Sequence, residues 1–128
     1  MSELASVMPF ATRLGIEVES ATAEEVRGSL RWAPELCTAG GVLHGGTLMA
    51  LADRLGAICA YLNLPEGATT ATIESKTNFF RAVREGAVAA VARPLHVGRS
   101  LIVVQTDLSD GAGKPVAQVT QTQAVLTS

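Results

Sequence analysis

The longest apolar stretch of the chain has the periodicity of an α-helix. Most residues between positions 47 and 62 are good helix formers, and the next proline is Pro65. The apolar side chains that recur at spacings of three and four are Leu48, Leu51, Ala52, Leu55, Ile58, Cys59 and Leu62. Because the opposite face is mostly Ala and Met, the pattern predicts one long helix that is buried over most of its surface.

On both sides of this helix the pattern changes to the period of two that is typical of β-strands. Before the helix, two strands are predicted around residues 16–19 and 26–32. After it, four strands are predicted at residues 68–81, 87–97, 100–109 and 114–127, separated by turns. A short leading helix is expected from about residue 3 to residue 12, broken or ended near Pro9.

These elements together predict an α+β fold. Successive strands joined by short turns should be antiparallel, and a sheet of about six strands has one face that a lone apolar helix can cover. An antiparallel sheet wrapped around one long central helix is the arrangement called the hotdog fold. The chain has 128 residues, so we expect a single domain over residues 1–128 with a core that needs no disulfide or metal.

Composition and charge narrow the choice of partners. Hydrophobic residues make up 48% of the chain and charged residues 17%, which suggests that part of the surface is hidden in an oligomer interface. The net charge of −2 argues against nucleic acid as the main partner. Basic residues are concentrated between positions 76 and 99, where a small polyphosphate ligand could use some of them, although ordinary solvated charges also explain any single one.

The sequence predicts a cytoplasmic protein without a membrane segment. The first basic residue is Arg13, so the N-terminus does not resemble a signal peptide. The apolar helix is interrupted by Asp53 and Arg54 and is too short to span a bilayer. Cys37 and Cys59 lack CxxC spacing and are expected to be reduced, and the sequence has no metal cluster, phosphate-binding loop or redox motif, so no cofactor is implied.

Asp53 is the most informative acidic residue. A carboxylate inside a mostly apolar helix is costly to desolvate unless it is paired or used in chemistry, and the alternative is that it pairs with Arg54 or reaches solvent. Gly45 and Gly46 leave backbone N–H groups uncovered at the helix start, where the helix dipole can stabilise an oxyanion. The alternative for the glycines is a tight loop that needs positive φ.

Three segments carry a resemblance to a known family. Residues 42–46 read VLHGG and are followed by Asp53 eight positions after Gly45, residues 78–86 read NFFRAVREG, and residues 96–100 read HVGRS. Together they are similar to the hotdog acyl-CoA thioesterases of the phenylacetate-degradation and 4-hydroxybenzoyl-CoA type, over about residues 14–126. The resemblance implies that the Gly45 N–H polarises the thioester carbonyl and that Asp53 is the general base or the nucleophile. It also implies that His44 orders the loop or helps to hold the substrate, and a purely structural role is the alternative.

The resemblance further implies residues that bind the substrate. Arg81, Arg99 and Ser100 match positions that contact the nucleotide part of CoA, and Gly46 belongs to the same helix start as the proposed donor.

Some neighbouring positions depart from the family pattern. Thr38 stands where the family commonly has Asn or Gln, and Ala57 stands where aryl-CoA enzymes can have a hydroxyl group. Thr72 aligns roughly with a serine that holds the water in some relatives. These positions therefore do not indicate which acyl-CoA is the substrate.

If Gly45 and Asp53 act on one thioester, their spacing requires a second copy of the chain. Eight residues along one helix correspond to about 12 Å, too far for both groups to reach one thioester carbon. Two antiparallel helices related by a two-fold axis would bring Gly45 of one subunit to Asp53 of the other. We therefore expect a homodimer, with dimers pairing into a homotetramer, and a raised pKa for Asp53 at the site.

The leading function hypothesis is hydrolysis of an aryl- or medium-chain acyl-CoA. Leu48, Met49, Phe79 and Phe80 are available to line an apolar pocket, although they could equally be simple core. One alternative is a non-catalytic acyl-CoA binding or sensing module that keeps the basic residues but does not need Asp53. Another is a hotdog dehydratase or hydratase, which would need a His–acid pair placed for proton transfer.

Overall fold

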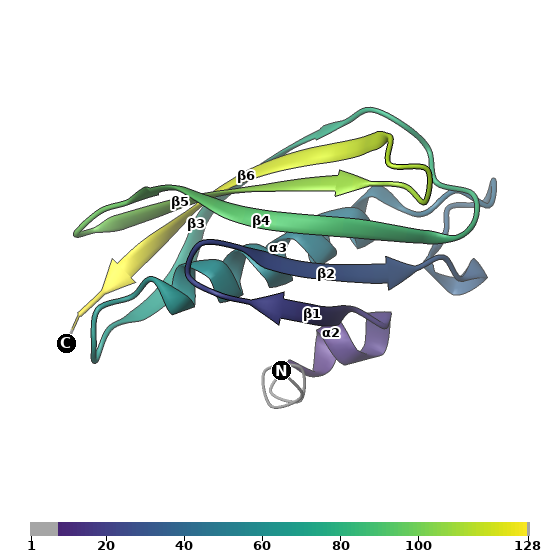
Figure 1. Ribbon diagram of the computed structural model, residues 1–128. Helices are drawn as coiled ribbons and strands as arrows, with labels where there is room; N and C mark the ends of the chain where they lie inside the picture. The colour runs from purple at the N-terminus through teal and green to yellow at the C-terminus, as the bar shows by residue number, and fades with distance from the viewer. Residues whose placement is uncertain (1–7, 128) are drawn as a thin grey trace.

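The computed structural model describes residues 8–127, which fold into one sheet around one long helix. The strands are β1 (Glu17–Ala21), β2 (Val26–Arg31), β3 (Thr69–Phe79), β4 (Ala87–Val97), β5 (Leu101–Ser109) and β6 (Pro115–Leu126). They form a six-stranded sheet in the order β1-β2-β4-β5-β6-β3, with antiparallel neighbours throughout, which curves around helix α3 (Gly45–Leu62) (Figure 1). The predicted hotdog architecture is confirmed.

The position of β3 differs from a simple succession of four strands. β4, β5 and β6 follow one another by turns, but β3 pairs with β6, from Thr69 opposite Leu126 to Phe79 opposite Ala117. The segment after β3 then crosses from this edge of the sheet past β6 and β5 to β4, which lies between β2 and β5. The Leu43 N–H donates to the Val83 carbonyl at 2.9 Å within this crossing. Period-two patterns identify which residues are strands but not which strands are neighbours, so the crossing was not predicted.

The leading helix also differs from its prediction. α2 (Pro9–Leu14) begins at Pro9 instead of ending near it, because proline is well suited to the first turn, where its missing N–H has no helical partner. Gly15 ends the helix with φ of 78°, and its N–H reaches the carbonyls of Ala11 and Thr12. Residues 3–7 of the predicted helix lie outside the described residues.

α3 packs one side against the middle strands of the sheet. Leu55 is fully buried, and a Cβ atom on Gly28 of β2 would lie 2.9 Å from a Leu55 methyl carbon, so the glycine lets helix and strand approach closely. The sheet residues of this core are Val26, Leu30, Val88, Ala90, Ala92, Ile102, Val104 and Leu108. The loop before α3 contains a short 3₁₀ helix, η1 (Pro34–Leu36).

The other side of α3 is not buried. Five residues at helical spacing lie on this side, and we call them the open stripe: Gly46, Met49, Asp53, Ala57 and Tyr61. Asp53 and Ala57 are half-buried, and the other three are exposed. Most of β3 is exposed as well, with Ile73 at 60% and Phe79 at 51% exposure. The prediction of a mostly buried helix therefore holds only for the side that faces the sheet.

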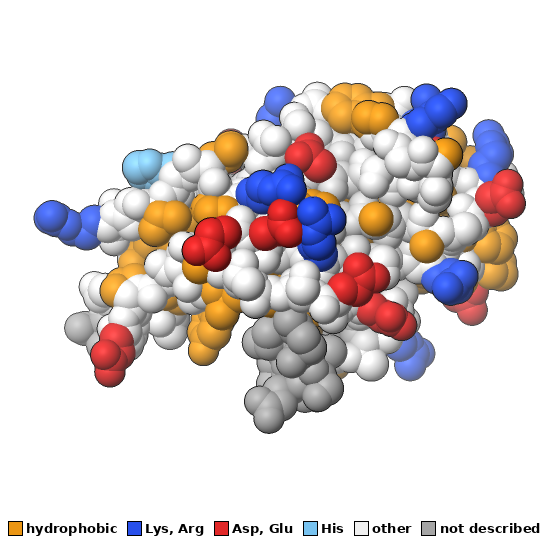
Figure 2. Space-filling view, in the orientation of Figure 1, with side chains coloured by type: hydrophobic (Ala, Val, Ile, Leu, Met, Phe, Trp, Pro, Cys, Tyr) orange, Lys and Arg blue, Asp and Glu red, His pale blue; other side chains and the backbone are white. Residues whose placement is uncertain are grey.

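The outer face of the sheet carries paired charges. Arg27 and Arg93 each contact the Glu25 carboxylate at 2.7 Å, and Figure 2 shows basic and acidic side chains gathered over the middle of this face. Arg93 is thus an ordinary surface charge, which was the alternative to a role in binding a polyphosphate ligand. No helix within residues 8–127 is long and apolar enough to cross a membrane.

Candidate active site

A tight loop leads into α3 and fixes its first residue. The Thr38 N–H donates to the Val42 carbonyl at 2.8 Å, and the Gly41 N–H donates to the Thr38 carbonyl at 3.1 Å. The Trp32 indole N–H donates to the Gly41 carbonyl at 3.1 Å. Gly41 has the positive φ, 78°, that this loop requires. Neither Gly45 nor Gly46 has a positive φ, so the tight-loop explanation for this pair of glycines is wrong.

His44 caps the helix and separates the roles of the two glycines. Its Nδ1 accepts the Gly46 N–H at 2.8 Å, so a neutral His44 carries its proton on Nε2. Its carbonyl accepts the Thr47 N–H at 2.9 Å. The Gly45 N–H makes no hydrogen bond to any residue in the described range. Of the two glycines, only Gly45 therefore has an N–H free to meet a developing negative charge.

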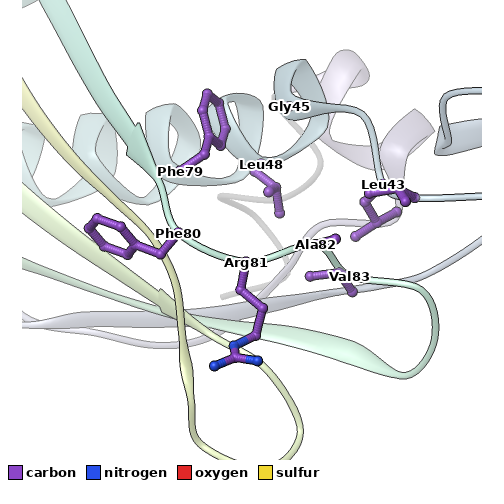
Figure 3. A pocket seen from close by; sticks show the side chains of 9 residues that line it. Leu43, Gly45, Leu48, Phe79, Phe80, Arg81, Ala82 and Val83 are labelled. Carbon is purple, nitrogen blue, oxygen red and sulfur yellow. The ribbon is translucent and has the colours of Figure 1, made fainter.

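An apolar pocket lies beside this helix start. It has a volume of about 320 Å³ and is lined by Val42, Leu43, Gly45, Leu48, Phe79, Phe80, Arg81, Ala82 and Val83. A Cβ atom on Gly45 would lie 3.0 Å from the Phe79 ring, so the bare glycine allows the aromatic ring to approach the helix start. Figure 3 shows Phe79 and Leu48 near the first turns of α3, and the Arg81 side chain pointing away from Gly45. Met49, also predicted for such a pocket, does not line it.

Asp53 sits on the open stripe, about two turns further along α3. Burial raises the pKa of its carboxyl group, and a hydrogen bond from Gln121 opposes that rise. The Gln121 Nε2 lies 3.5 Å from Asp53 Oδ1. Pairing with Arg54, the alternative left open by the sequence, is not what holds Asp53, because Arg54 is buried on another side of the helix with 6% exposure.

Gln121 and Gln123 are site residues that the sequence did not single out. Both lie on the inner face of β6 and are buried, and they are joined by a contact of 3.5 Å. The available signal was the alternation in β6, which places Gln121 and Gln123 on the same face as the buried Val119. Two amides at positions where the pattern calls for apolar residues are unusual in a strand that packs on a helix.

The remaining predicted binding residues lie in two separate places. Thr38 is in the loop before α3, and Arg81 lines the pocket at the same end of the molecule. Arg99 and Ser100 are in the turn between β4 and β5, where the Ser100 carbonyl accepts the Val125 N–H at 2.9 Å. Arg81 and Arg99 thus lie toward opposite ends of the sheet and are not brought together within one chain.

Thr72 lies on β3, opposite Gln123 of β6. Directly paired residues share a face of the sheet, so Thr72 faces the same side as the buried amides. Its side chain is exposed, next to an irregularity in the strand pairing between Thr72 and Glu74. Thr72 is therefore on the correct face, although no hydrogen bond joins it to Asp53 in the described chain.

The Gly45 N–H and the Asp53 carboxylate are suited to acyl chemistry, but within one chain they lie apart. The pocket next to the Gly45 N–H does not include Asp53, in agreement with the axial separation of about 12 Å for eight helical residues. Cys59 is not a competing nucleophile, because burial raises the pKa of its thiol to about 11. Residues 8–127 contain no group of three or more His, Cys, Asp or Glu side chains placed to hold a metal ion.

Comparison with known proteins identifies the family. The model of the Thioesterase superfamily matches residues 40–117, which include the loop, α3 and the crossing segment. The chain belongs to the thioesterase superfamily. It is an enzyme that hydrolyses thioesters, and this favours the catalytic prediction over the non-catalytic binding module.

Three relatives show how far the similarity extends. The crystal structure of a mutant thioesterase from Pseudomonas aeruginosa superposes with a TM-score of 0.92 at 31% identity, covering 98% of this chain and 92% of that one. A thioesterase structure from Haemophilus influenzae gives a TM-score of 0.91 at 30% identity, covering 98% of this chain and 87% of that one. The 1,4-dihydroxy-2-naphthoyl-CoA hydrolase of Escherichia coli is 34% identical over 86 residues, which is 67% of this chain and 63% of the relative.

Proposed function

We propose that this thioesterase hydrolyses aryl- or medium-chain acyl-CoA to the carboxylic acid and CoA, as a single hotdog domain over residues 1–128. The name of the Escherichia coli relative specifies an aryl-CoA substrate, which supports this substrate class. Aromatic and aliphatic side chains line the pocket beside Gly45, and such walls suit an aryl or alkyl acyl group. The closer relationship to the phenylacetate-degradation and 4-hydroxybenzoyl-CoA type is part of the proposal.

The observation that carries the proposal is the pair formed by an unpartnered N–H at Gly45 and a half-buried carboxylate at Asp53. The Gly45 N–H, at the positive end of α3, donates to the thioester oxygen as negative charge develops on it. Asp53 takes a proton from water, which adds to the carbonyl carbon, and the C–S bond then breaks to release CoA. If Asp53 is instead the nucleophile, it forms a mixed anhydride as the thiolate leaves, and water then hydrolyses the anhydride. A raised pKa suits either role near neutral pH.

The site needs two protomers, so the active form is proposed to be a homodimer. The open stripe of α3 and the exposed edge strand β3 lie on the side of the molecule that the sheet does not cover. Ile73, Phe79, Met49 and Tyr61 expose apolar surface there, which favours contact with a second copy. A two-fold axis across this side would place Gly45 of one protomer opposite Asp53 of the partner subunit. Pairing of such dimers into a homotetramer remains a prediction.

The other site residues receive their roles within this dimer. His44 is proposed to order the loop by capping the helix, and its Nε2 stays available to the substrate. Thr38, Gly46 and Thr72 are proposed to contact the substrate or the water. Arg81 and the Arg99–Ser100 turn lie toward opposite ends of one chain, and a two-fold axis brings opposite ends of two chains together, so we propose that CoA is bound by residues of both protomers. A cytoplasmic location is part of the same proposal.

A panel of acyl-CoA substrates with detection of the free thiol tests this function. Benzoyl-, phenylacetyl- and octanoyl-CoA should be hydrolysed by the wild-type protein, whereas hydration of crotonyl-CoA should not occur. Asp53→Ala should lower kcat by about 10²-fold to 10⁴-fold, the range typical of a lost general base, while size-exclusion chromatography shows the same assembly. Asp107→Ala, which removes a carboxylate on the outer face of β5, serves as the control. Wild-type rates in the Asp53→Ala variant would overturn the assignment.

A further inference from the structure

The helix carrying Asp53 rests on a row of buried polar side chains. Gln121 Nε2 lies 3.5 Å from Asp53 Oδ1 and also 3.5 Å from Gln123 Oε1. Gln123 Nε2 in turn lies 3.5 Å from Thr70 Oγ1 on β3. Gln121 and Gln123 are 0% and 1% exposed, so the middle of this row is shielded from bulk water, whereas Thr70 and Asp53 at its two ends are half-buried.

The direction of the Gln121 amide follows from its partners. An ionised carboxylate only accepts hydrogen bonds, so the Nε2 group and not Oε1 must face Asp53. Both hydrogens of this NH₂ group then have acceptors, one on Asp53 and one on Gln123. Gln123 therefore fixes the orientation in which Gln121 donates to the carboxylate.

The helix is shaped to admit this amide. A methyl group on Gly56 would overlap the Gln121 Oε1 atom, and Gly56 lies one helical turn after Asp53 on the same side of α3. Glycine inside a helix is less favourable than alanine, so Gly56 makes room for the Gln121 amide at some cost to helix stability. Gln121 Oε1 is itself buried with no hydrogen-bond partner among residues 8–127, a second feature that does not serve stability.

Among the residues that the structure describes, no charged side chain contributes to the pKa shift of Asp53. β6 carries no titratable residue, and Glu74 and Lys76 of β3 pair with Thr122 and Thr120, on the face of the sheet away from Gln121. The described chain contributes only burial and the Gln121 hydrogen bond to the pKa of Asp53. Among the described residues, Gln121 is therefore the side chain that opposes the effect of burial on this carboxylate.

We propose that Gln121 is a positioning residue for Asp53, holding Oδ1 with its amide so that Oδ2 is directed to the water or thioester carbon. This inference rests on the proposed role of Asp53 in hydrolysis. Burial raises the pKa of the Asp53 carboxyl group, and the Gln121 hydrogen bond stabilises the ionised form and lowers the pKa again. Gln121 thus orients the carboxylate and, against the larger effect of burial, lowers the pH above which it is active.

The test is a set of kcat/KM profiles against pH for wild-type protein, Gln121→Met and Gln121→Glu. Gln121→Met keeps the length of the side chain but removes the donor, so the acid limb should move to higher pH and kcat on the plateau should fall about tenfold, with little change in KM. Gln121→Glu puts a second carboxylate beside Asp53, so its acid limb should move further still. Gln118→Met, the same substitution on the outer face of the same strand, is the matched control and should leave the profile unchanged.

Gly56→Ala displaces the Gln121 amide without replacing Gln121 itself. Alanine favours the helix, but its methyl group displaces Gln121, so this variant should show the same shift of the acid limb. The Asp53 carboxyl carbon can also be titrated by NMR in wild-type protein and each variant, which measures its pKa without turnover. An acid limb and an Asp53 titration unchanged in both Gln121→Met and Gly56→Ala would overturn the inference. If Asp53→Ala retained wild-type activity, the proposed function itself would fail, which is a distinguishable result.

Discussion

The inner face of the sheet has two halves of different chemistry, and α3 lies across both. The half formed by β2, β4 and β5 is almost wholly apolar, with Val26, Val88 and Val104 fully buried against the helix. The half formed by β6 and β3 presents Gln121, Gln123 and a series of threonines to the same helix. The first half supplies the burial that stabilises the fold, and the second surrounds the carboxylate of the proposed site.

The two halves also differ in how well their polar groups are satisfied. In the polar half, Gln121 Oε1 and Thr77 Oγ1 are buried without a hydrogen-bond partner among the described residues. In the apolar half, Thr106 Oγ1 of β5 is the corresponding exception. The unsatisfied Oε1 of Gln121, the residue that contacts Asp53, indicates that this region is arranged for chemistry at some expense of stability.

After Asp53→Ala, the largest effect on kcat is expected at the helix start. In Gly45→Pro the N–H is removed, while proline suits the first helical position and His44, with ψ of 137°, suits the residue before a proline. Loss of one oxyanion donor should lower kcat by about 10²-fold to 10³-fold. Gly45→Ala adds the same Cβ atom beside Phe79 but keeps the N–H, and it should retain clearly more activity. Equal losses in the two variants would show that the N–H is not the group that matters.

Substitutions in the apolar half should lower the stability of the protein without changing its catalysis. Leu55→Ala leaves a cavity beside Gly28 and should reduce the free energy of unfolding by about 2 to 5 kcal/mol. Denaturant titrations at one fixed protein concentration measure this loss, with the exposed Leu62→Ala as the control. The folded Leu55→Ala enzyme should keep its acid limb at the wild-type pH. A displaced acid limb would mean that the two halves are not separable.

Asp53→Asn should stabilise the protein in a pH-dependent way. A carboxyl group whose folded pKa is raised binds its proton more tightly in the folded state, so wild-type stability falls as pH rises above the ordinary range for aspartate. Asparagine does not ionise, and its Oδ1 can accept the hydrogen bond from Gln121 Nε2 in place of the carboxylate, so the variant should melt at a higher temperature than wild type near neutral pH. This advantage should shrink toward pH 4. A difference in melting temperature between the variant and wild type that stays constant from neutral pH to pH 4 would contradict a raised pKa for Asp53.

The smallest effect is expected at the rim of the pocket. Arg81 is exposed and its side chain points away from Gly45, so Arg81→Gln should raise KM for acyl-CoA by at most about fivefold and leave kcat unchanged (Figure 3). Arg31→Gln, an exposed arginine at the end of β2, is the control. A change in kcat instead of KM would assign Arg81 to the chemistry and not to binding of the nucleotide.

Much of the fold was predictable because its signals are local. The helix of residues 45–62 and all six strands follow from apolar periodicity, and the Asp110 turn is held by its own carboxylate, which accepts the N–H groups of Ala112 and Lys114 at 2.9 Å. The place of β3 at the edge was not predictable, because strand order depends on contacts far apart in the sequence. The start of α2 at Pro9 was missed because proline was taken as the end of a helix and not as its first residue.

The site was predictable to a similar degree. Asp53 and Gly45 stand out in the sequence, one as a charge in an apolar helix and one as part of a glycine pair at its start. His44 showed no signal for the N-cap role it has, since histidine is not among the usual capping residues. Gln121 was missed because an amide inside an alternating strand matters only once its neighbour across the core, Asp53, is known.

The most direct test of a site shared between protomers is complementation in mixed dimers. Gly45→Pro and Asp53→Ala are each expected to be nearly inactive, and the two proteins are unfolded together and refolded as a mixture. Random pairing makes about half of the dimers mixed, each with one site that has both an intact Gly45 and an intact Asp53, so about a quarter of wild-type activity should return. Activity that stays at the level of the separate variants would contradict a site built from two chains.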